Sequence, residues 1–257
     1  WDSNFTLSHN KNKIKELVRD YVHPETGELI NKNRLDVGGL GKARFILKEG
    51  GTLGDLYTQS DLKRDDNGMV DIDPTGIVAI ENNLPDIKLG SVFPKANLAW
   101  SNHFSWKGIS LSALFTARIG GIVYSATEAA MDQYGVSERS ALGRDNGGVL
   151  VNNRTLVDAQ NYYTTIGSES GLPQYYTYNA TNVRLQEASI GYLIPRKWLG
   201  NVCDIQVSVI GRNLWMIYNK APFDPESVAT TDNYYQGIDY FMLPSTRNIG
   251  FNVKINF

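Results

Sequence analysis

The chain has 257 residues, of which 25 are basic and 27 acidic, so its formal net charge is -2 and it offers no broad basic surface for nucleic acid. Its mean hydropathy is -0.30, and it lacks the run of about 18 apolar residues that a transmembrane helix requires. This does not exclude a membrane β-barrel, because in barrel strands only every second residue is apolar. The single cysteine, Cys203, excludes an internal disulfide and a cysteine-based zinc site.

The first residues predict a strand. Trp1, Phe5 and Leu7 alternate with polar residues, and the strand is expected to end near Asn10. Because successive strand side chains point to opposite faces of a sheet, this alternation gives one apolar and one polar face.

The segment from residue 10 to residue 95 is less regular. Asp66-Asn67-Gly68 predicts a tight hairpin inside a long loop. Helix-like spacing over Lys11 to Val22 predicts a short surface helix; the apolar residues with that spacing are Ile14, Leu17, Val18 and Tyr21.

Two long strands and a two-residue turn come next. Ala96 to Trp106 alternates apolar and polar residues, and so does Ile109 to Ile119, where only Leu114 falls on the polar side. Lys107-Gly108 between them is typical of a hairpin turn. Each arm is about twice the length of a usual sandwich strand and about the length that crosses a bilayer.

The stretch from Gly120 to about Asn182 has no sustained period of either strand or helix. Loops of this length without structure are rare in compact domains and are usually functional. Alternation resumes at Val183 and continues to Ile194, with a slip of one residue at Gln186-Glu187 that predicts a β-bulge. Pro195 is expected to end this strand.

Two further strands are expected. Asp204 to Val209 alternates and leads into Gly211 to Trp215, a second long loop runs over residues 216–245, and the closing strand begins at Asn248. The closing strand has Ile249, Phe251, Val253, Ile255 and Phe257 on one face and Asn248, Asn252, Lys254 and Asn256 on the other.

The connections between these strands alternate short and long, as in outer-membrane barrels, which have short periplasmic turns and long external loops. The sequence therefore favours an all-β fold: a segment of an antiparallel transmembrane β-barrel, with about six strands and with extracellular loops over residues 10–95, 120–182 and 216–245. Six strands cannot close a barrel, which needs about eight. The alternative is a soluble secreted β-sandwich that serves as a glycan-binding module.

Residue clusters that suggest chemistry have simpler explanations. Asp65, Asp66, Asp71 and Asp73 resemble a calcium loop, but their spacing departs from an EF-hand and such residues are ordinary turn formers. The carboxylates of Asp224 and Glu226 suggest a glycosidase pair, but they lie in a proline-containing loop. We therefore expect no enzymatic activity, no metal site and no cofactor. The three histidines, His9, His23 and His103, are scattered.

Five short motifs follow one another along the chain: Trp106-Lys107-Gly108, Asn182-Val183-Arg184-Leu185 with Gly191, Tyr192 and Pro195, Gly211-Arg212-Asn213-Leu214, Asp224-Pro225-Glu226, and Pro244-Ser245-Thr246-Arg247. In their order and spacing they resemble the carboxy-terminal barrel region of a SusC-like (SusC/RagA), TonB-dependent outer-membrane transporter. The resemblance is strong over residues 85–257 and weaker over residues 1–12 and 54–57.

The resemblance implies a 22-stranded barrel plugged by an amino-terminal domain in the outer membrane of a Gram-negative bacterium. It implies TonB-dependent uptake of oligosaccharides or peptides with a SusD-like surface lipoprotein. The plug, the peptide that contacts the TonB complex and most strands lie outside this sequence, so we expect it to be one piece of a longer or cleaved polypeptide.

Three sets of residues are functional candidates. Aromatic side chains of the long loops are expected to stack on substrate, with packing between loops as the alternative: Tyr162, Tyr163, Tyr175, Tyr176, Tyr178, Tyr234, Tyr235, Tyr240 and Phe241. Polar strand residues are expected to face the barrel lumen: Ser112, Arg118, Gln206, Asn252 and Lys254. Aromatic residues at strand ends are expected to form membrane girdles in contact with lipid: Trp106, Trp198, Trp215 and Phe257.

Overall fold

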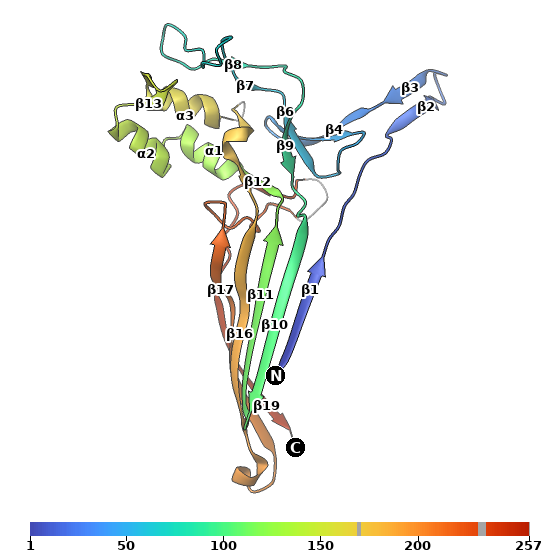
Figure 1. Cartoon of the computed structure of the whole chain (residues 1–257), viewed down its shortest axis with the longest axis vertical. Helices are drawn as coiled ribbons and strands as arrows, with labels where there is room; N and C mark the ends of the chain where they lie inside the picture. Colours follow the sequence, from blue (N-terminus) through green and yellow to red (C-terminus); the bar gives the residue numbers. More distant parts are fainter. Residues whose placement is uncertain (169–170, 231–234, 257) are drawn as a thin grey trace.

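The computed structural model describes residues 1–168, 171–230 and 235–256. A long antiparallel sheet carries at one end a cap of short strands and helices (Figure 1). The sheet has six strands in the order β1-β10-β11-β16-β17-β19. Their bounds are β1 (Asp2–Ser8), β10 (Ala96–Trp106), β11 (Ile109–Ile119), β16 (Asn182–Ile194), β17 (Asp204–Asn219) and β19 (Asn248–Asn256).

The predicted hairpin is confirmed, with both arms ending where the alternation ends. Lys107 and Gly108 have φ values of 47° and 88°, and positive φ at both positions is the requirement of the type I′ hairpin turn. Glycine adopts this conformation without strain, whereas Lys107 does so at a cost that the paired strands offset.

The predicted bulge is also confirmed. Leu114 pairs with Glu187 and Phe115 with Leu185, so Gln186 is skipped in the register of β11 and β16. The extra residue returns the apolar side chains of β16 to the face used by β11. β17 runs to Asn219, beyond the expected start of the loop at residue 216, because its pairing with β16 continues to Asn182.

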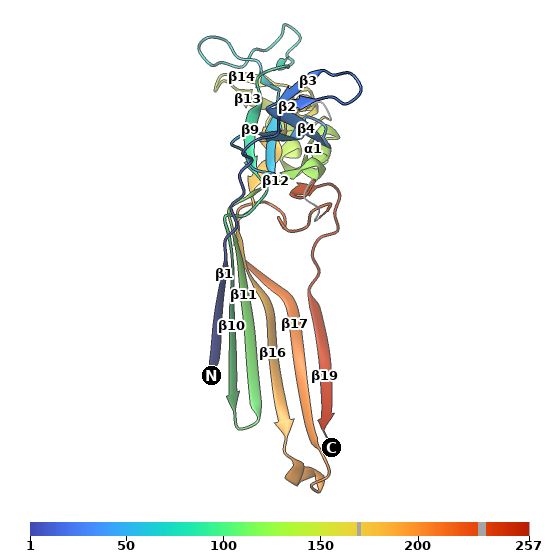
Figure 2. The same ribbon diagram turned by 90° about the vertical axis from the view of Figure 1, so that its right-hand side faces the viewer.

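The connections at the two ends of the sheet differ sharply. At one end lie the turn Lys107-Gly108 and the short link through η2 (Arg196–Leu199). At the other end all longer connections enter the cap, and Figure 2 shows the sheet standing clear below it. The cap strands of the first connection are β2 (Val18–Val22), β3 (Leu29–Lys32), β4 (Arg34–Leu40), β5 (Ala43–Lys48), β6 (Asp55–Thr58), β7 (Asp61–Leu62), β8 (Ile80–Glu81) and β9 (Ile87–Ser91).

The second connection, from residue 120 to 181, is folded rather than irregular, which corrects the expectation of an unpatterned loop. Ser125, Ser137 and Asp158 accept hydrogen bonds from backbone N–H groups at the starts of three short helices, which satisfies helix N-termini. Its elements are β12 (Ile122–Ser125), α1 (Ala126–Gln133), α2 (Glu138–Asp145), β13 (Val149–Val151), β14 (Thr155–Val157), α3 (Ala159–Gly167), η1 (Pro173–Tyr176) and β15 (Thr177–Asn179).

All three long connections share one hydrophobic core. Phe45 and Leu56 of the first, Tyr176 of the second and Ile238 of the third are buried in the same cluster. β12 pairs with β15 and also, in parallel, with β18 (Ile238–Asp239) of the third connection. The cap is therefore one folded unit built from three segments distant in sequence.

The expected helix over Lys11 to Val22 is wrong. Residues 18–22 form β2, which pairs with β3 in a projecting hairpin. Tyr21 and Val22 are both exposed there. The helix-like spacing of apolar residues in this segment therefore does not correspond to the buried face of a helix. Within the described residues, no helix is long and apolar enough to cross a bilayer.

Candidate functional site

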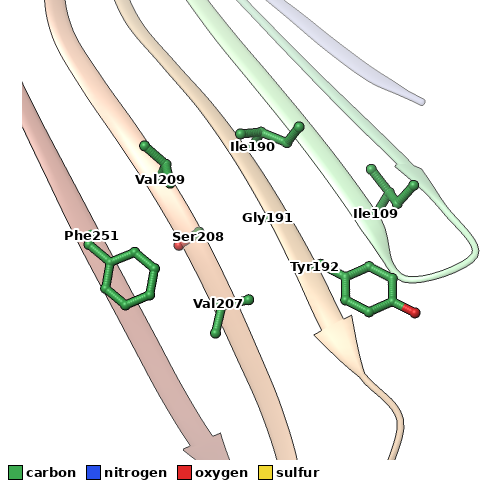
Figure 3. A pocket seen from close by; sticks show the side chains of 8 residues that line it. All are labelled: Ile109, Ile190, Gly191, Tyr192, Val207, Ser208, Val209 and Phe251. Carbon is green, nitrogen blue, oxygen red and sulfur yellow. The ribbon is translucent and has the colours of Figure 1, made fainter.

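One face of the long sheet is apolar across all six strands. Cross-strand neighbours on this face include Phe5, Trp100 and Phe115 at the β1 side and Ile190, Val209 and Phe251 at the β19 side. Figure 3 shows Ile190, Val209 and Phe251 with Ile109, Tyr192 and Val207 on the same face.

Much of this face is open to the surroundings. Phe5 is 63% exposed and Phe251 70% exposed, and no second sheet covers them within the described residues. Soluble proteins rarely expose a contiguous apolar area of this extent. The face therefore has the chemistry of a surface that contacts lipid or another apolar surface.

The opposite face is mostly polar. Ser112 lies beside His103, whose Nδ1 is 3.0 Å from the Ser112 Oγ atom. All five residues expected to face a lumen lie on this polar face: Ser112, Arg118, Gln206, Asn252 and Lys254. Their position in a lumen stays a prediction.

The alternation has exceptions on both faces. Leu114 lies on the polar face opposite Ser101, as expected from the sequence. Asn102 lies on the apolar face, where it is buried and accepts a hydrogen bond of 3.4 Å from the indole of Trp1. The hydrogen bond reduces the cost of placing an amide among apolar side chains.

Arg184 of β16 joins the polar face to the third connection. Its guanidinium donates two hydrogen bonds to Asp224, of 2.8 and 3.3 Å, and lies 3.4 Å from the carboxylate of Glu226. Asn182 donates to Glu226 at 3.2 Å and accepts from Arg184 at 3.2 Å. Paired, bidentate contacts of this kind are the strong charge-assisted hydrogen bonds of proteins.

The ionisation of Asp224 follows from these contacts. Burial alone would raise the pKa of Asp224, but hydrogen bonds from Arg184, Ser245 and the Glu226 backbone hold it below its usual value. Asp224 is therefore a carboxylate at neutral pH and balances the charge of the buried Arg184.

Parts of four of the five motifs that carry the family resemblance meet around this ion pair, whereas Trp106-Lys107-Gly108 lies at the short-turn end of the sheet. Ser245 donates to Asp224 at 2.5 Å, and Asn213 donates to the carbonyl of Thr246 at 3.3 Å. Arg212 pairs with Glu187 at 2.8 Å on the neighbouring strand. In the sequence, only the order and spacing of the motifs indicated that these residues belong together; the contacts themselves were not predicted.

The loop aromatics divide into buried and exposed groups. Tyr176 is 1% exposed and its hydroxyl donates to Asp132 at 2.8 Å, so its assignment as a substrate-stacking residue is wrong. Burial, followed by the nearby charge of Asp132, raises the pKa of Tyr176. Tyr162, Tyr163 and Tyr175 are partly buried and pack against the same core.

Tyr178 also has a structural partner, because its hydroxyl donates to the carboxylate of Glu128. Burial, with that hydrogen bond, raises the pKa of Tyr178 to about 12. Tyr235, Tyr240 and Phe241 are exposed, and the rings of the last two meet edge to face at 5.2 Å. Tyr234 lies outside the described residues.

Three of the four girdle candidates can be placed. Trp106 and Trp198 lie at the short-turn end of the sheet, and Trp215 lies towards the cap end of β17. All three are exposed. Their contact with a membrane stays a prediction, and Phe257 lies outside the described residues.

The acidic loop of the first connection uses its carboxylates to shape turns. Asp65 accepts from the backbone of Asn67 and Met69, and the predicted hairpin closes through a bridge between Arg64 and Val70. Asp73 accepts from the backbone of Thr75 and Ile77. In the part of the chain that the structure describes, no group of three or more potential metal ligands gathers.

No family model matches the chain. A curated relative, TonB-dependent receptor P3 of Formosa agariphila, is 23% identical over 286 residues, which cover 99% of this chain and 26% of that protein. The structure of the RagAB peptide importer in the closed-closed state has a TM-score of 0.63 at 17% identity, covering 99% of this chain and 27% of that one.

A second structure, the RagAB peptide transporter, has a TM-score of 0.61 at 16% identity, again over 99% of this chain and 27% of that chain. The chain thus spans about a quarter of the length of the relatives that it matches. These comparisons agree with the resemblance that the sequence motifs indicated and with an antiparallel β-barrel segment as the fold.

Proposed function

We propose that this chain, a segment of a SusC-like, TonB-dependent transporter, forms part of the barrel wall of an outer-membrane nutrient importer. The two-faced sheet carries this proposal: an apolar face for lipid spans all six strands, and a polar face lies behind it. The remaining strands and the plug would come from the rest of the transporter, which would pair with the free edges of β1 and β19.

The names of the relatives support import as the activity. One relative is called a TonB-dependent receptor, and the matching structures are of a peptide importer. We infer TonB-driven uptake of peptides or oligosaccharides together with a SusD-like surface lipoprotein, in the outer membrane of a Gram-negative bacterium. The protein would move its substrate without making or breaking a covalent bond.

The cap would then lie on the extracellular side and receive the substrate. Tyr235, Tyr240 and Phe241 have exposed rings and are the aromatic positions best placed for contact with a ligand. The polar face, with Ser112 and Lys254, would line the lumen through which the substrate passes.

The alternative, a soluble β-sandwich that binds glycans, requires a second sheet over the apolar face. Within residues 1–168, 171–230 and 235–256 no such sheet packs there. The exposed rings of Phe5 and Phe251 therefore count against a sandwich.

Two measurements on the intact protein test the proposal. We expect it to fractionate with the outer membrane and to need detergent for extraction, and we expect uptake of its nutrient to stop when the TonB complex is deleted. A protein that stays monodisperse in buffer without detergent, or uptake that is independent of TonB, would contradict the proposal.

A further inference from the structure

A basic segment follows β1 directly and leads into the cap. Residues 9–19 contain four basic residues and one acidic residue, so the formal charge of this segment is +3. The acidic residue, Glu16, pairs with Arg19 at 3.5 Å. The other three basic residues are Lys11, Lys13 and Lys15, which we call the lysine row. Figure 1 shows the segment rising from β1 towards the projecting hairpin of β2 and β3.

The residues between the lysines fix this segment to the cap. The side-chain oxygen of Asn12 accepts a hydrogen bond of 3.0 Å from the backbone of Leu53. Ile14 is buried. The N–H group of Ile14 donates to the carbonyl of Gly51 at 2.9 Å, and its carbonyl accepts from the N–H group of Gly50 at 2.8 Å. Asn12 and Ile14 therefore face the cap.

The lysine row lies on the other side of the segment. All three lysines are exposed, and they alternate with the residues that contact the cap. Successive side chains of an extended chain point to opposite sides. The lysine row therefore continues the series of Phe5 and Leu7, which lie on the apolar face of the sheet. It follows that face directly, at the cap end of β1.

The charge of the lysine row is not balanced by an ion pair. In residues 1–168, 171–230 and 235–256, none of the ion pairs includes a lysine of the row. Other lysines of the cap differ in this respect, because Lys48 pairs with Asp86 at 2.5 Å and Lys63 with Asp71 at 2.7 Å. The lysine row therefore presents three ammonium groups to a negatively charged partner.

The position of the lysine row indicates which partner this is. The apolar band of a membrane barrel ends where the acyl chains of the bilayer give way to the headgroups. Basic side chains just beyond such a band are attracted to anionic headgroups. Lysine binds phosphate as a compact point charge and needs no fixed geometry to do so, so a row of flexible lysines suits lipids that move along the wall.

We propose that the lysine row binds phosphate headgroups of net negative charge, carried by membrane lipids that lie against β1 at the cap end of the sheet. The proposal rests on the proposed function, because it requires the apolar face to contact lipid. The bound headgroups fix the depth of β1 in the bilayer, since Asn12 and Ile14 hold the segment on the cap.

The test measures which lipids gather beside β1 in the intact transporter. A fluorescent dye is attached at residue 7 through Leu7→Cys, with Cys203→Ser so that Cys203 takes up no dye. The protein is placed in phosphatidylcholine vesicles that contain a small fraction of a quenching lipid. This lipid is either phosphatidic acid or phosphatidylcholine, each with a nitroxide near the top of one acyl chain.

Two triple variants are compared. The row variant combines Lys11→Gln, Lys13→Gln and Lys15→Gln. The control variant removes the same number of charges from exposed lysines elsewhere in the long connections, through Lys32→Gln, Lys63→Gln and Lys220→Gln.

We expect phosphatidic acid to be enriched about tenfold over phosphatidylcholine beside the dye when the lysine row is intact, and in the control variant as well. In the row variant the two lipids should quench equally, and high salt should reduce the enrichment because it screens exposed charges. Enrichment that persists in the row variant, is lost equally in the control variant, or is removed by inorganic phosphate at constant ionic strength would overturn the proposal.

The proposed function and the lysine row can fail separately in this experiment. If both nitroxide lipids quench the dye equally in the unsubstituted row, the sheet contacts lipid but the row binds no anionic headgroup. If neither lipid quenches the dye, the apolar face of β1 does not contact lipid, and both proposals are contradicted.

Discussion

The guanidinium of Arg184 is paired with the carboxylate of Asp224, 40 residues later in the chain, by two hydrogen bonds of 2.8 and 3.3 Å. The pair joins a strand of the long sheet to the last long connection. It is also the point where the motifs of β16, of residues 220–228 and of the segment before β19 come together. We expect it to determine how the cap is held on the sheet.

Removing Arg184 leaves Asp224 as a nearly buried charge without its partner. Arg184→Gln should therefore destabilise the intact protein by about 3–5 kcal/mol, and adding Asp224→Asn should recover part of the loss. Urea unfolding in lipid vesicles measures both. The control is Arg19→Gln, because Arg19 forms an exposed pair of 3.5 Å with Glu16, and its loss should cost less than about 1 kcal/mol. Equal effects at the two sites would contradict this role of Arg184.

The two faces of the sheet predict opposite tolerances for charge. Val209→Arg places a cation on the apolar face and should destabilise the inserted protein by about 2–4 kcal/mol if this face meets lipid. Ser208→Arg changes the preceding residue, which lies on the polar face opposite Asn252, and should have a much smaller effect. Heat-modifiable mobility of protein assembled in outer membranes reports both. Equal tolerance of the two substitutions would count against a lipid-facing sheet.

The cap contains an acid-sensitive ion pair. Hydrogen bonds from Arg34, opposed by burial and aided by Lys48, lower the pKa of Asp86 from 3.8 to about 2. Because the pKa is lower in the folded state, the stabilisation is present above about pH 4 and is lost as the pH falls towards 2.

Asp86→Asn should therefore remove part of the decrease in melting temperature between pH 4 and pH 2, measured by near-ultraviolet circular dichroism of the intact protein. The matched control is Asp66→Asn, which changes an exposed turn residue. If the melting temperature of Asp86→Asn falls between pH 4 and pH 2 as much as that of the wild type, the ion pair of Asp86 with Arg34 does not cause the acid sensitivity of the cap.

Buried and exposed loop aromatics should behave differently. Tyr176→Phe removes a hydrogen bond to the buried Asp132 and should lower stability by about 1–3 kcal/mol. Phe241→Ser changes an exposed ring and should leave the melting temperature nearly unchanged while weakening substrate binding. Thermal unfolding and calorimetry on the same two variants separate these effects. If Tyr176→Phe weakens substrate binding and leaves the melting temperature unchanged, Tyr176 is a substrate-binding residue and its structural role is contradicted.

The long sheet was predictable because its signal is local. The alternation in residues 96–119 predicted both arms of the hairpin, and the slip at Gln186 predicted the bulge. Each of these features depends on residues adjacent in sequence, where side chains must alternate between two faces.

The cap and the ion pair were not predictable in the same way. α1 and α2 are each 8 residues long, too short for a sustained helical period, and the cap core forms from three separate connections. The contact between Arg184 and Asp224 depends on how the third connection folds back over the sheet. The burial of Tyr176 likewise follows from tertiary packing, which its position in a long loop of the sequence does not indicate.

The orientation of β17 in the membrane is the most direct test of the account. Spin labels placed one at a time at residues 205–210 of the intact transporter in lipid vesicles would report collisions with oxygen and with a water-soluble nickel complex. Labels at Ile205, Val207 and Val209 should collide mainly with oxygen, and labels at Gln206, Ser208 and Ile210 should show less oxygen and more nickel contact. Equal accessibility to the nickel complex along all six positions would contradict a barrel wall with its apolar face in lipid.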